Sequence, residues 1–310
     1  MHTTQPTRLF VAGGIACAAA LSLIAPTPAS ARLAPAPGSP SAEVLPPVGP
    51  TVPIPIPIAL GTRQYVSDTS EEDNYFYKTA RATCPTGTVV VGTGVSFINN
   101  DDQVYVDAII PSETTVSVSA YADETGHPGD WSITAMATCA ARPRNYTIVH
   151  EQDALASIED RSYSAYCPSG SQPLAPGFRI FRSYGQVSVT GVRAFLGTAN
   201  KVTVSASEDD TGQSGDWRTE AYAVCASNVA GLEIATEADW AARTYEVDHA
   251  YCPGGKEALG AGFDTYYNGD VLISHFYGYP EQDYSYVIAR EDEDGAPATW
   301  TLIVDAICVT

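Results

Sequence analysis

Apolar and polar residues alternate along much of the chain. Counted from Trp131, every second residue up to position 137 is apolar, and Trp217 begins a similar alternation. A period of two is typical of strands with one buried face. Segments 89–97, 104–110 and 115–122 are rich in β-branched or aromatic residues, and no segment of the sequence carries a capped apolar stripe of helical period. The pattern predicts an all-β protein.

One cysteine-led pattern occurs three times. Cys84, Cys167 and Cys252 are each followed directly by proline, by glycine three residues later and by glycine again ten residues later. A tryptophan stands eight residues before each closing cysteine, at Trp131, Trp217 and Trp300. Self-similarity at a fixed period predicts copies of one structural unit, here with about five or six strands each. The predicted repeats cover residues 62–142, 143–229 and 230–310.

The repeat also suggests how the cysteines pair. Pairing within each copy is the simplest scheme that treats all copies alike, and each bridge would contribute about 4 kcal/mol by the chain-entropy model. Pairing between copies is the alternative. The predicted bridges are Cys84–Cys139, Cys167–Cys225 and Cys252–Cys308.

These motifs resemble a small all-β repeat of exported actinobacterial proteins. The features that carry the resemblance are Cys-Pro-x-Gly at 167–170, Gly-Phe at 177–178 and Ala-Val-Cys-Ala at 223–226; the third copy departs from it with Val309. The resemblance implies three tandem disulfide-bridged β-sandwiches and no assigned activity. A weaker similarity, to vitelline membrane outer layer proteins, implies the alternative of a pseudo-threefold β-prism-like assembly.

The N-terminal part is typical of an exported protein. Residues 1–31 have an apolar run followed by Ala29-Ser30-Ala31, which fits a signal-peptide cleavage site. Residues 32–61 are proline-rich and predict an extended linker. The number of cysteines that remain after cleavage is even, which also favours export because exported proteins form disulfides. We therefore expect a secreted, extracellular protein with no membrane insertion after signal cleavage.

The overall charge excludes one class of partner. The chain has 16 Lys and Arg against 36 Asp and Glu, for a net charge of −20. Nucleic-acid binding needs clustered basic residues against phosphates, so we do not expect it. The apolar fraction of 45% is sufficient for a folded core.

Each repeat has an acidic loop before its tryptophan. Clustered carboxylates at a turn suit Ca²⁺, which takes six to eight oxygen ligands. No loop supplies a full ligand set, however, and the third copy has Thr299 in place of the last aspartate. A solvated turn is therefore the favoured interpretation, with Ca²⁺ as the cofactor to test. The candidate metal ligands are Asp123, Glu124, Asp130, Asp209, Asp210 and Asp216.

Tyrosines are concentrated in the third repeat. Tyrosine combines an apolar ring with a hydroxyl, as binding surfaces require, although strands favour tyrosine in any case. The repeated tryptophans begin strands beside small apolar residues, so we expect them in the core rather than at a sugar-stacking surface. The candidate ligand-binding residues are Tyr266, Tyr267, Tyr277, Tyr279, Tyr284 and Tyr286.

Motifs for catalysis are missing from the sequence. It has no Gly-x-Ser-x-Gly elbow, and His150-Glu151 is not completed to a metalloprotease motif because Ala154 stands at the second histidine position. No catalytic residue is assigned, and we favour a non-catalytic binding or surface module for an extracellular glycan, the cell wall or a cell-surface protein. The alternatives are a structural or assembly protein of the cell envelope, and an exported hydrolase with a site in repeat 3.

Overall fold

The computed structural model describes residues 57–310, except 101–102, 124, 267–268, 280 and 297–298. These residues belong to one unit, 53–310. The predicted signal peptide and most of the predicted linker lie outside the described residues. Apart from one 3-10 turn at Pro253–Gly255, every regular element in the described part of the chain is a β-strand.

Each repeat forms six strands. Those of the first are β1 (Gln64–Thr69), β2 (Tyr77–Thr83), β3 (Thr88–Ile98), β4 (Val104–Pro111), β5 (Thr115–Ala122) and β6 (Ser132–Ala141). Those of the second are β7 (Thr147–Gln152), β8 (Asp160–Tyr166), β9 (Gln172–Phe181), β10 (Val187–Phe195), β11 (Lys201–Glu208) and β12 (Arg218–Ala226). Those of the third are β13 (Glu233–Ala242), β14 (Tyr245–Tyr251), β15 (Glu257–Asp264), β16 (Val271–Tyr279), β17 (Tyr284–Glu291) and β18 (Trp300–Val309).

Strand order shows how the repeats combine. Each repeat divides its strands between two sheets, three in each, and its two inner strands pair with strands of the neighbouring repeats. The resulting antiparallel sheets have the orders β1-β6-β3-β16-β17-β14, β2-β5-β4-β9-β12-β7 and β13-β18-β15-β10-β11-β8. The all-β fold of three disulfide-bridged repeats is thus confirmed. The repeats are not three separate sandwiches, because they share sheets as the pseudo-threefold alternative requires.

The three junctions between repeats are equivalent. A strand of the β4 type pairs with a strand of the β3 type from another repeat, in the pairs β4–β9, β10–β15 and β16–β3. Only two residue pairs form at each junction; at the first they are Ala108 with Arg179 and Ile109 with Phe178. The third pair joins the last repeat to the first, so the set of sheets closes on itself.

The glycine ten residues after each opening cysteine lies at such a junction. A Cβ atom on Gly177 would stand 2.6 Å from the carbonyl oxygen of Ile109, and one on Gly94 would stand 2.6 Å from that of Phe276. Only glycine lets the two backbones approach this closely. The repeated glycine in the sequence therefore marks where one repeat meets the next.

The core contains the tryptophans that the alternation of apolar and polar positions predicts to be buried. Trp131 and Trp217 are fully buried and Trp300 nearly so, which confirms the core interpretation. A second cluster collects the residue seven positions after each opening cysteine: Val91, Leu174 and Leu259. Each of these is the extra residue of a β-bulge and is fully buried. Bulges thus direct one large side chain from every repeat into a shared core.

Disulfides close each repeat as predicted. Cys84 bonds Cys139, Cys167 bonds Cys225 and Cys252 bonds Cys308, with Cα–Cα distances of 5.7, 5.7 and 5.5 Å. The first bridge joins the end of β2 to β6, which belong to different sheets. Three bridges suit an oxidising compartment. No helix in the described residues is long and apolar enough to cross a membrane.

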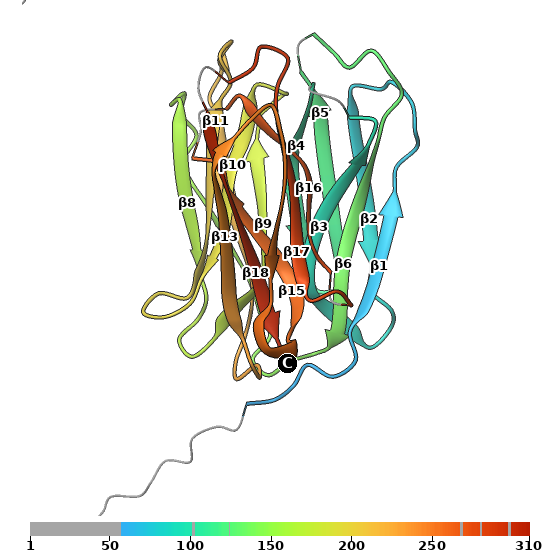
Figure 1. Ribbon diagram of the computed structural model, residues 1–310, viewed down its shortest axis with the longest axis vertical. Helices are drawn as coiled ribbons and strands as arrows, with labels where there is room; N and C mark the ends of the chain where they lie inside the picture. The colour runs from blue at the N-terminus through green and yellow to red at the C-terminus, as the bar shows by residue number, and fades with distance from the viewer. Residues whose placement is uncertain (1–56, 101–102, 124, 267–268, 280, 297–298) are drawn as a thin grey trace, which may run out of the picture. The chain divides into compact units, whose positions relative to one another are not determined.

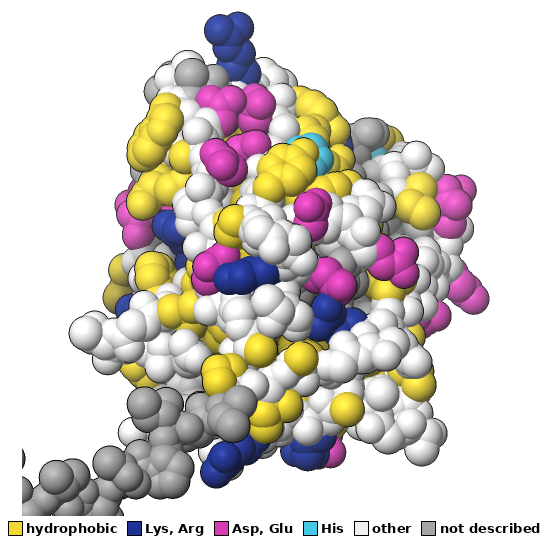
Figure 2. All heavy atoms as spheres, turned by 60° about the horizontal axis from the view of Figure 1, so that its bottom comes forward, with side chains coloured by type: hydrophobic (Ala, Val, Ile, Leu, Met, Phe, Trp, Pro, Cys, Tyr) yellow, Lys and Arg dark blue, Asp and Glu magenta, His cyan; other side chains and the backbone are white. Residues whose placement is uncertain are grey.

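The strands run along a common direction, so the loops gather at two ends (Figure 1). Figure 2 shows one face of the molecule, over which acidic side chains are spread, in keeping with the net charge of −20. The outer faces of the three sheets remain uncovered by helices in the described part of the chain. These faces are where side chains can meet a ligand.

Candidate functional site

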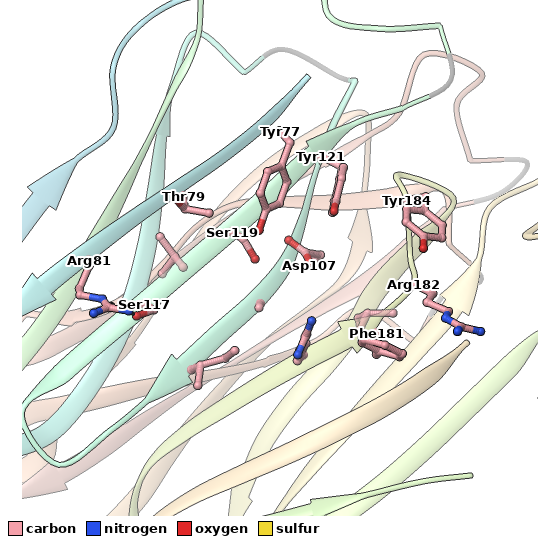
Figure 3. Close-up of a pocket in the computed structure, with 15 residues that line it drawn as sticks. Tyr77, Thr79, Arg81, Asp107, Ser117, Ser119, Tyr121, Phe181, Arg182 and Tyr184 are labelled. Carbon is pink, nitrogen blue, oxygen red and sulfur yellow. Dashed lines mark hydrogen bonds between the residues drawn. The ribbon is translucent and has the colours of Figure 1, made fainter. Parts of the chain in front are cut away.

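A groove of about 430 Å³ lies on the outer face of the sheet β2-β5-β4-β9-β12-β7. It follows the β4–β9 junction, so that repeat 1 forms one side and repeat 2 the other. Figure 3 shows Tyr77, Tyr121 and Asp107 in its middle, with Arg81 on one side and Phe181 and Arg182 on the other. The site thus combines aromatic rings with groups of both charges.

Strand register explains how repeat 1 forms its side. Tyr77 on β2 pairs with Tyr121 on β5, and their rings lie 4.4 Å apart between centroids. Paired residues of an antiparallel sheet share a face, so both rings point outward. Asp107 is the extra residue of a β-bulge between Val106 and Ala108, which turns its side chain to the groove.

Asp107 is a buried carboxyl group at the base of the groove. The residue is only 6% exposed, and burial raises its pKa to about 6, although a hydrogen bond with Ser119 and the charge of Arg179 oppose this shift. Its Oδ1 atom has no hydrogen-bond partner among the described residues. A buried oxygen without a partner costs free energy, and a hydroxyl group of a ligand would satisfy it.

Three arginines of repeat 2 surround the ring of Phe181. The guanidinium carbons of Arg218, Arg179 and Arg182 lie 4.7, 4.8 and 5.5 Å from the ring centroid, within the range of cation–π contact. Arg218 also forms an ion pair with Glu220 at 2.7 Å. Arg179 and Arg182 form no ion pair with any described residue, although the charge of Arg179 acts on Asp107.

The loop that carries Arg182 and Tyr184 is held in a strained conformation. Arg182 has a φ of 68° and Tyr184 a φ of 49°, a region that residues other than glycine rarely occupy. The side-chain amide of Gln213 donates hydrogen bonds to the carbonyl oxygens of Arg182 and Ser183, at 2.6 and 3.0 Å. Gly185 packs against β5 so closely that a Cβ atom would stand 2.6 Å from the carbonyl oxygen of Ala122. Contacts from both repeats therefore fix this edge of the groove.

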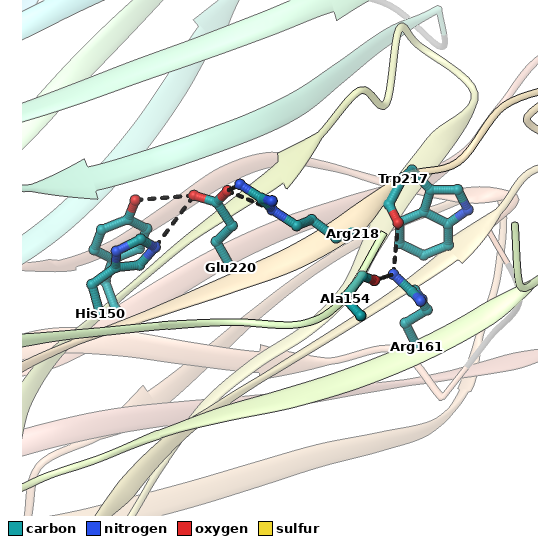
Figure 4. Close-up of polar contacts among 7 residues, drawn as sticks. His150, Ala154, Arg161, Trp217, Arg218 and Glu220 are labelled. Carbon is teal, nitrogen blue, oxygen red and sulfur yellow. Dashed lines mark hydrogen bonds and ion pairs between the residues drawn. The ribbon is translucent and has the colours of Figure 1, made fainter. Parts of the chain in front are cut away.

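A second polar network lies beside the groove on the same sheet. Glu220 is buried and accepts hydrogen bonds from Arg218 at 2.7 and 2.9 Å and from Tyr222 at 3.2 Å, with His150 at 3.3 Å (Figure 4). Its carboxylate is thus satisfied within the protein. The same figure shows Arg161 donating to the carbonyl oxygens of Ala154 and Trp217, a contact that supports the core.

The groove has a counterpart at the β10–β15 junction with different chemistry. Thr190 occupies the bulge position of Asp107, and Asp264 occupies the register position of Arg179. This counterpart has a volume of about 390 Å³ and also includes Tyr266, which corresponds to Phe181. The position of the groove is therefore repeated, but its charge is not.

Four of the six candidate tyrosines come together on the sheet face formed by β16 and β17. Tyr279, Tyr284 and Tyr286 are half-buried and surround His249 and His275, with ring centroids 4.7 to 6.4 Å apart within this group. Tyr277 is fully buried and shares a hydrogen bond of 2.6 Å with Thr138. Tyr266 lies apart from them in the counterpart groove, and Tyr267 falls outside the described residues.

The acidic loops meet at one end of the molecule. Burial raises the pKa of the Tyr105 hydroxyl, and the charges of the equivalent residues Asp123, Asp209 and Asp292 raise it further. Burial and neighbouring carboxylates raise the pKa of Asp292 and of Glu293 to about 7. Asp130, Asp210 and Asp216 are exposed, and Glu124 falls outside the described residues. Among the described residues no three acidic, histidine or cysteine side chains are arranged to hold a metal ion, so Ca²⁺ binding stays a prediction.

Sequence reasoning missed the groove because its two sides come from different repeats. The available signal was a departure from the repeat: Asp107 replaces the hydroxyl residues Thr190 and Ser274 at the bulge position.

No protein-family model matches the chain, and no curated protein matches it at a significant level. The resemblance to exported repeat proteins therefore stays a prediction.

Proposed function

We propose that the protein is secreted and binds an extracellular glycan in the β4–β9 groove without cleaving it. The observation that carries this proposal is the combination of Tyr77, Tyr121 and Phe181 with the unpartnered oxygen of Asp107 in one groove. Aromatic rings pack against the apolar faces of sugars, while a few fixed polar groups orient their hydroxyls. The size of the groove, about 430 Å³, is typical of small-ligand sites.

Binding without hydrolysis suits the charges in the groove. Glycosidases act through a pair of carboxyl groups that flank the scissile bond. Asp107 is the single carboxylate among the described residues that line this groove, and the nearby Glu220 is neutralised by Arg218. The proposal therefore includes no catalytic residue.

Export is part of the proposal. The signal-like residues 1–31 and the proline-rich segment 32–61 support it, as do the three disulfides. Mass spectrometry of the secreted protein should find an N-terminus at Arg32. Retention of residues 1–31 in the exported protein would contradict this part of the proposal.

A glycan array with the purified protein tests the binding function. The expected result is binding to a defined set of oligosaccharides, with affinity reduced at least about tenfold in Tyr121→Ala. Tyr266→Ala is the matched control, because it removes an exposed aromatic ring from the counterpart groove. No binding at high protein concentration, together with self-association in light scattering, would favour a structural role in the cell envelope instead.

A further inference from the structure

The groove has a charge opposite to that of the molecule around it. The chain has a net charge of −20, yet Arg179 and Arg182 flank Phe181 without an ion-pair partner among the described residues. Arg193 on β10, by contrast, donates to both carboxylate oxygens of Asp305 at 2.7 and 2.9 Å. Arg179 and Arg182 thus place two guanidinium groups beside one aromatic ring with no carboxylate bound to either among the described residues.

Their arrangement suits an oxyanion. Guanidinium is planar and presents paired N–H donors that match the two oxygens of a carboxylate or sulfate. The ring of Phe181 holds both groups by cation–π contact, which limits the side-chain entropy that binding would otherwise remove. The fixed loop at residues 182–186 places Arg182 in the same way.

The middle of the groove sets the orientation of a ligand. Asp107 and Ser119 lie there, beside the hydroxyl groups of Tyr77 and Tyr121, and Phe181 and Arg182 lie to one side of them. An anionic group would be repelled by the Asp107 carboxylate, whereas sugar hydroxyls would donate to its free oxygen. The arginines and the Asp107 region thus suit different groups of one ligand.

We propose that the groove recognises an acidic saccharide, with its carboxylate or sulfate on Arg179 and Arg182 and its hydroxyls on Asp107 and Ser119. This inference rests on the proposed glycan-binding function and specifies the class of glycan. Carboxylate and sulfate share the chemistry that these arginines recognise, and the probes separate the two.

Calorimetric titration of the purified full chain provides the test. The probes are a tetramer of galacturonic acid, its fully methyl-esterified form, a chondroitin sulfate tetrasaccharide and its desulfated form. The double variant Arg179→Gln/Arg182→Gln is compared with the control Arg144→Gln, which changes an exposed arginine that does not line the groove. Unchanged thermal unfolding confirms that each variant folds.

We expect the galacturonate tetramer, the chondroitin sulfate tetrasaccharide or both to bind at least about tenfold more tightly than the matching less charged probe. The double variant should lose this preference, and Arg144→Gln should keep it. Equal binding of the galacturonate tetramer and its methyl ester, with no preference for the sulfated over the desulfated probe, would overturn the inference and leave the glycan-binding function standing. A preference that survives in the double variant, or disappears in Arg144→Gln, would overturn the assignment to Arg179 and Arg182. If no probe bound, both proposals would fail for these glycans.

Discussion

The β4–β9 junction and the β10–β15 junction have the same backbone plan and opposite charges. Both place two residue pairs at the contact, a bulge beside it and a groove outside it. At the first, Asp107 and Arg179 face the groove; at the second, Thr190 and Asp264 stand in their places. The repeated residues therefore determine the backbone arrangement, whereas the residues that depart from the repeat determine what each face can bind.

The largest expected effect comes from removing the disulfide of repeat 2, the repeat that contributes a strand to both junctions. Replacing Cys167 and Cys225 with alanine removes the bridge of repeat 2, which closes a segment of 58 residues. We expect the free energy of unfolding to fall by about 4 kcal/mol, because the unfolded chain gains conformational entropy. Urea unfolding of the purified variant measures this change, and a fall of less than about 1 kcal/mol would contradict it.

A smaller effect distinguishes how tightly the two junctions are packed. In Gly177→Ala a new Cβ atom would meet the carbonyl oxygen of Ile109 at 2.6 Å, so we expect a loss of about 2 kcal/mol. At the equivalent Gly262 the nearest atoms are 3.1 Å away, and Gly262→Ala should cost about 1 kcal/mol or less. Urea midpoints of the two variants test the order, and an equal or reversed cost would contradict it.

Arg179→Asp copies the charge of the second junction into the first. It should weaken binding of an acidic oligosaccharide by about tenfold or more, or about 1.4 kcal/mol, because repulsion replaces attraction at the anion site. Asp264→Asn is the control in the counterpart groove and should leave the affinity unchanged. Fluorescence titration compares them, and unaltered binding by Arg179→Asp would contradict the assigned site.

The smallest effect concerns pH. Burial raises the pKa of Asp107 to about 6, above the value near 4 of an unfolded chain, so the folded protein holds this proton more tightly. The stability that this gives is present below about pH 4 and is lost as the pH rises through 6. In Asp107→Thr, which copies Thr190, the fall in stability between pH 4 and 7 should be smaller and the stability at pH 8 higher by about 1 kcal/mol.

Thermal unfolding between pH 4 and 8 provides that measurement. The acidic loops contribute a fall in the same direction, because the pKa values of Asp292 and Glu293 are also raised. The informative quantity is therefore the difference between Asp107→Thr and the unaltered protein. Identical pH profiles for the two would show that the Asp107 carboxyl group is not perturbed.

Residue spacing predicted the disulfide pairing and the buried strand faces well. Equal spacing of cysteines identified the pairing, because a symmetric repeat leaves one simple scheme, and alternation around Trp131 identified a buried face. Alternation shows that a strand exists but does not identify its partner, so the sharing of sheets between repeats could not be deduced. The tight approach at Gly177 is visible in the sequence only as a repeated glycine.

The candidate site could not be predicted from the sequence, for a related reason. Asp107 and Arg179 belong to different repeats and approach each other only because β4 pairs with β9. The tyrosines of repeat 3 stood out by their number, and four of them do gather on one sheet face. Number alone, however, gave no indication that Tyr277 is buried in a hydrogen bond with Thr138.

A crystal of the protein soaked with the galacturonate tetramer would show where the sugar binds. We expect density for the sugar in the β4–β9 groove, with a carboxylate within hydrogen-bond distance of Arg179 or Arg182 and no density in the β10–β15 counterpart. Density in the counterpart, or on the tyrosines of β16 and β17 alone, would contradict this expectation.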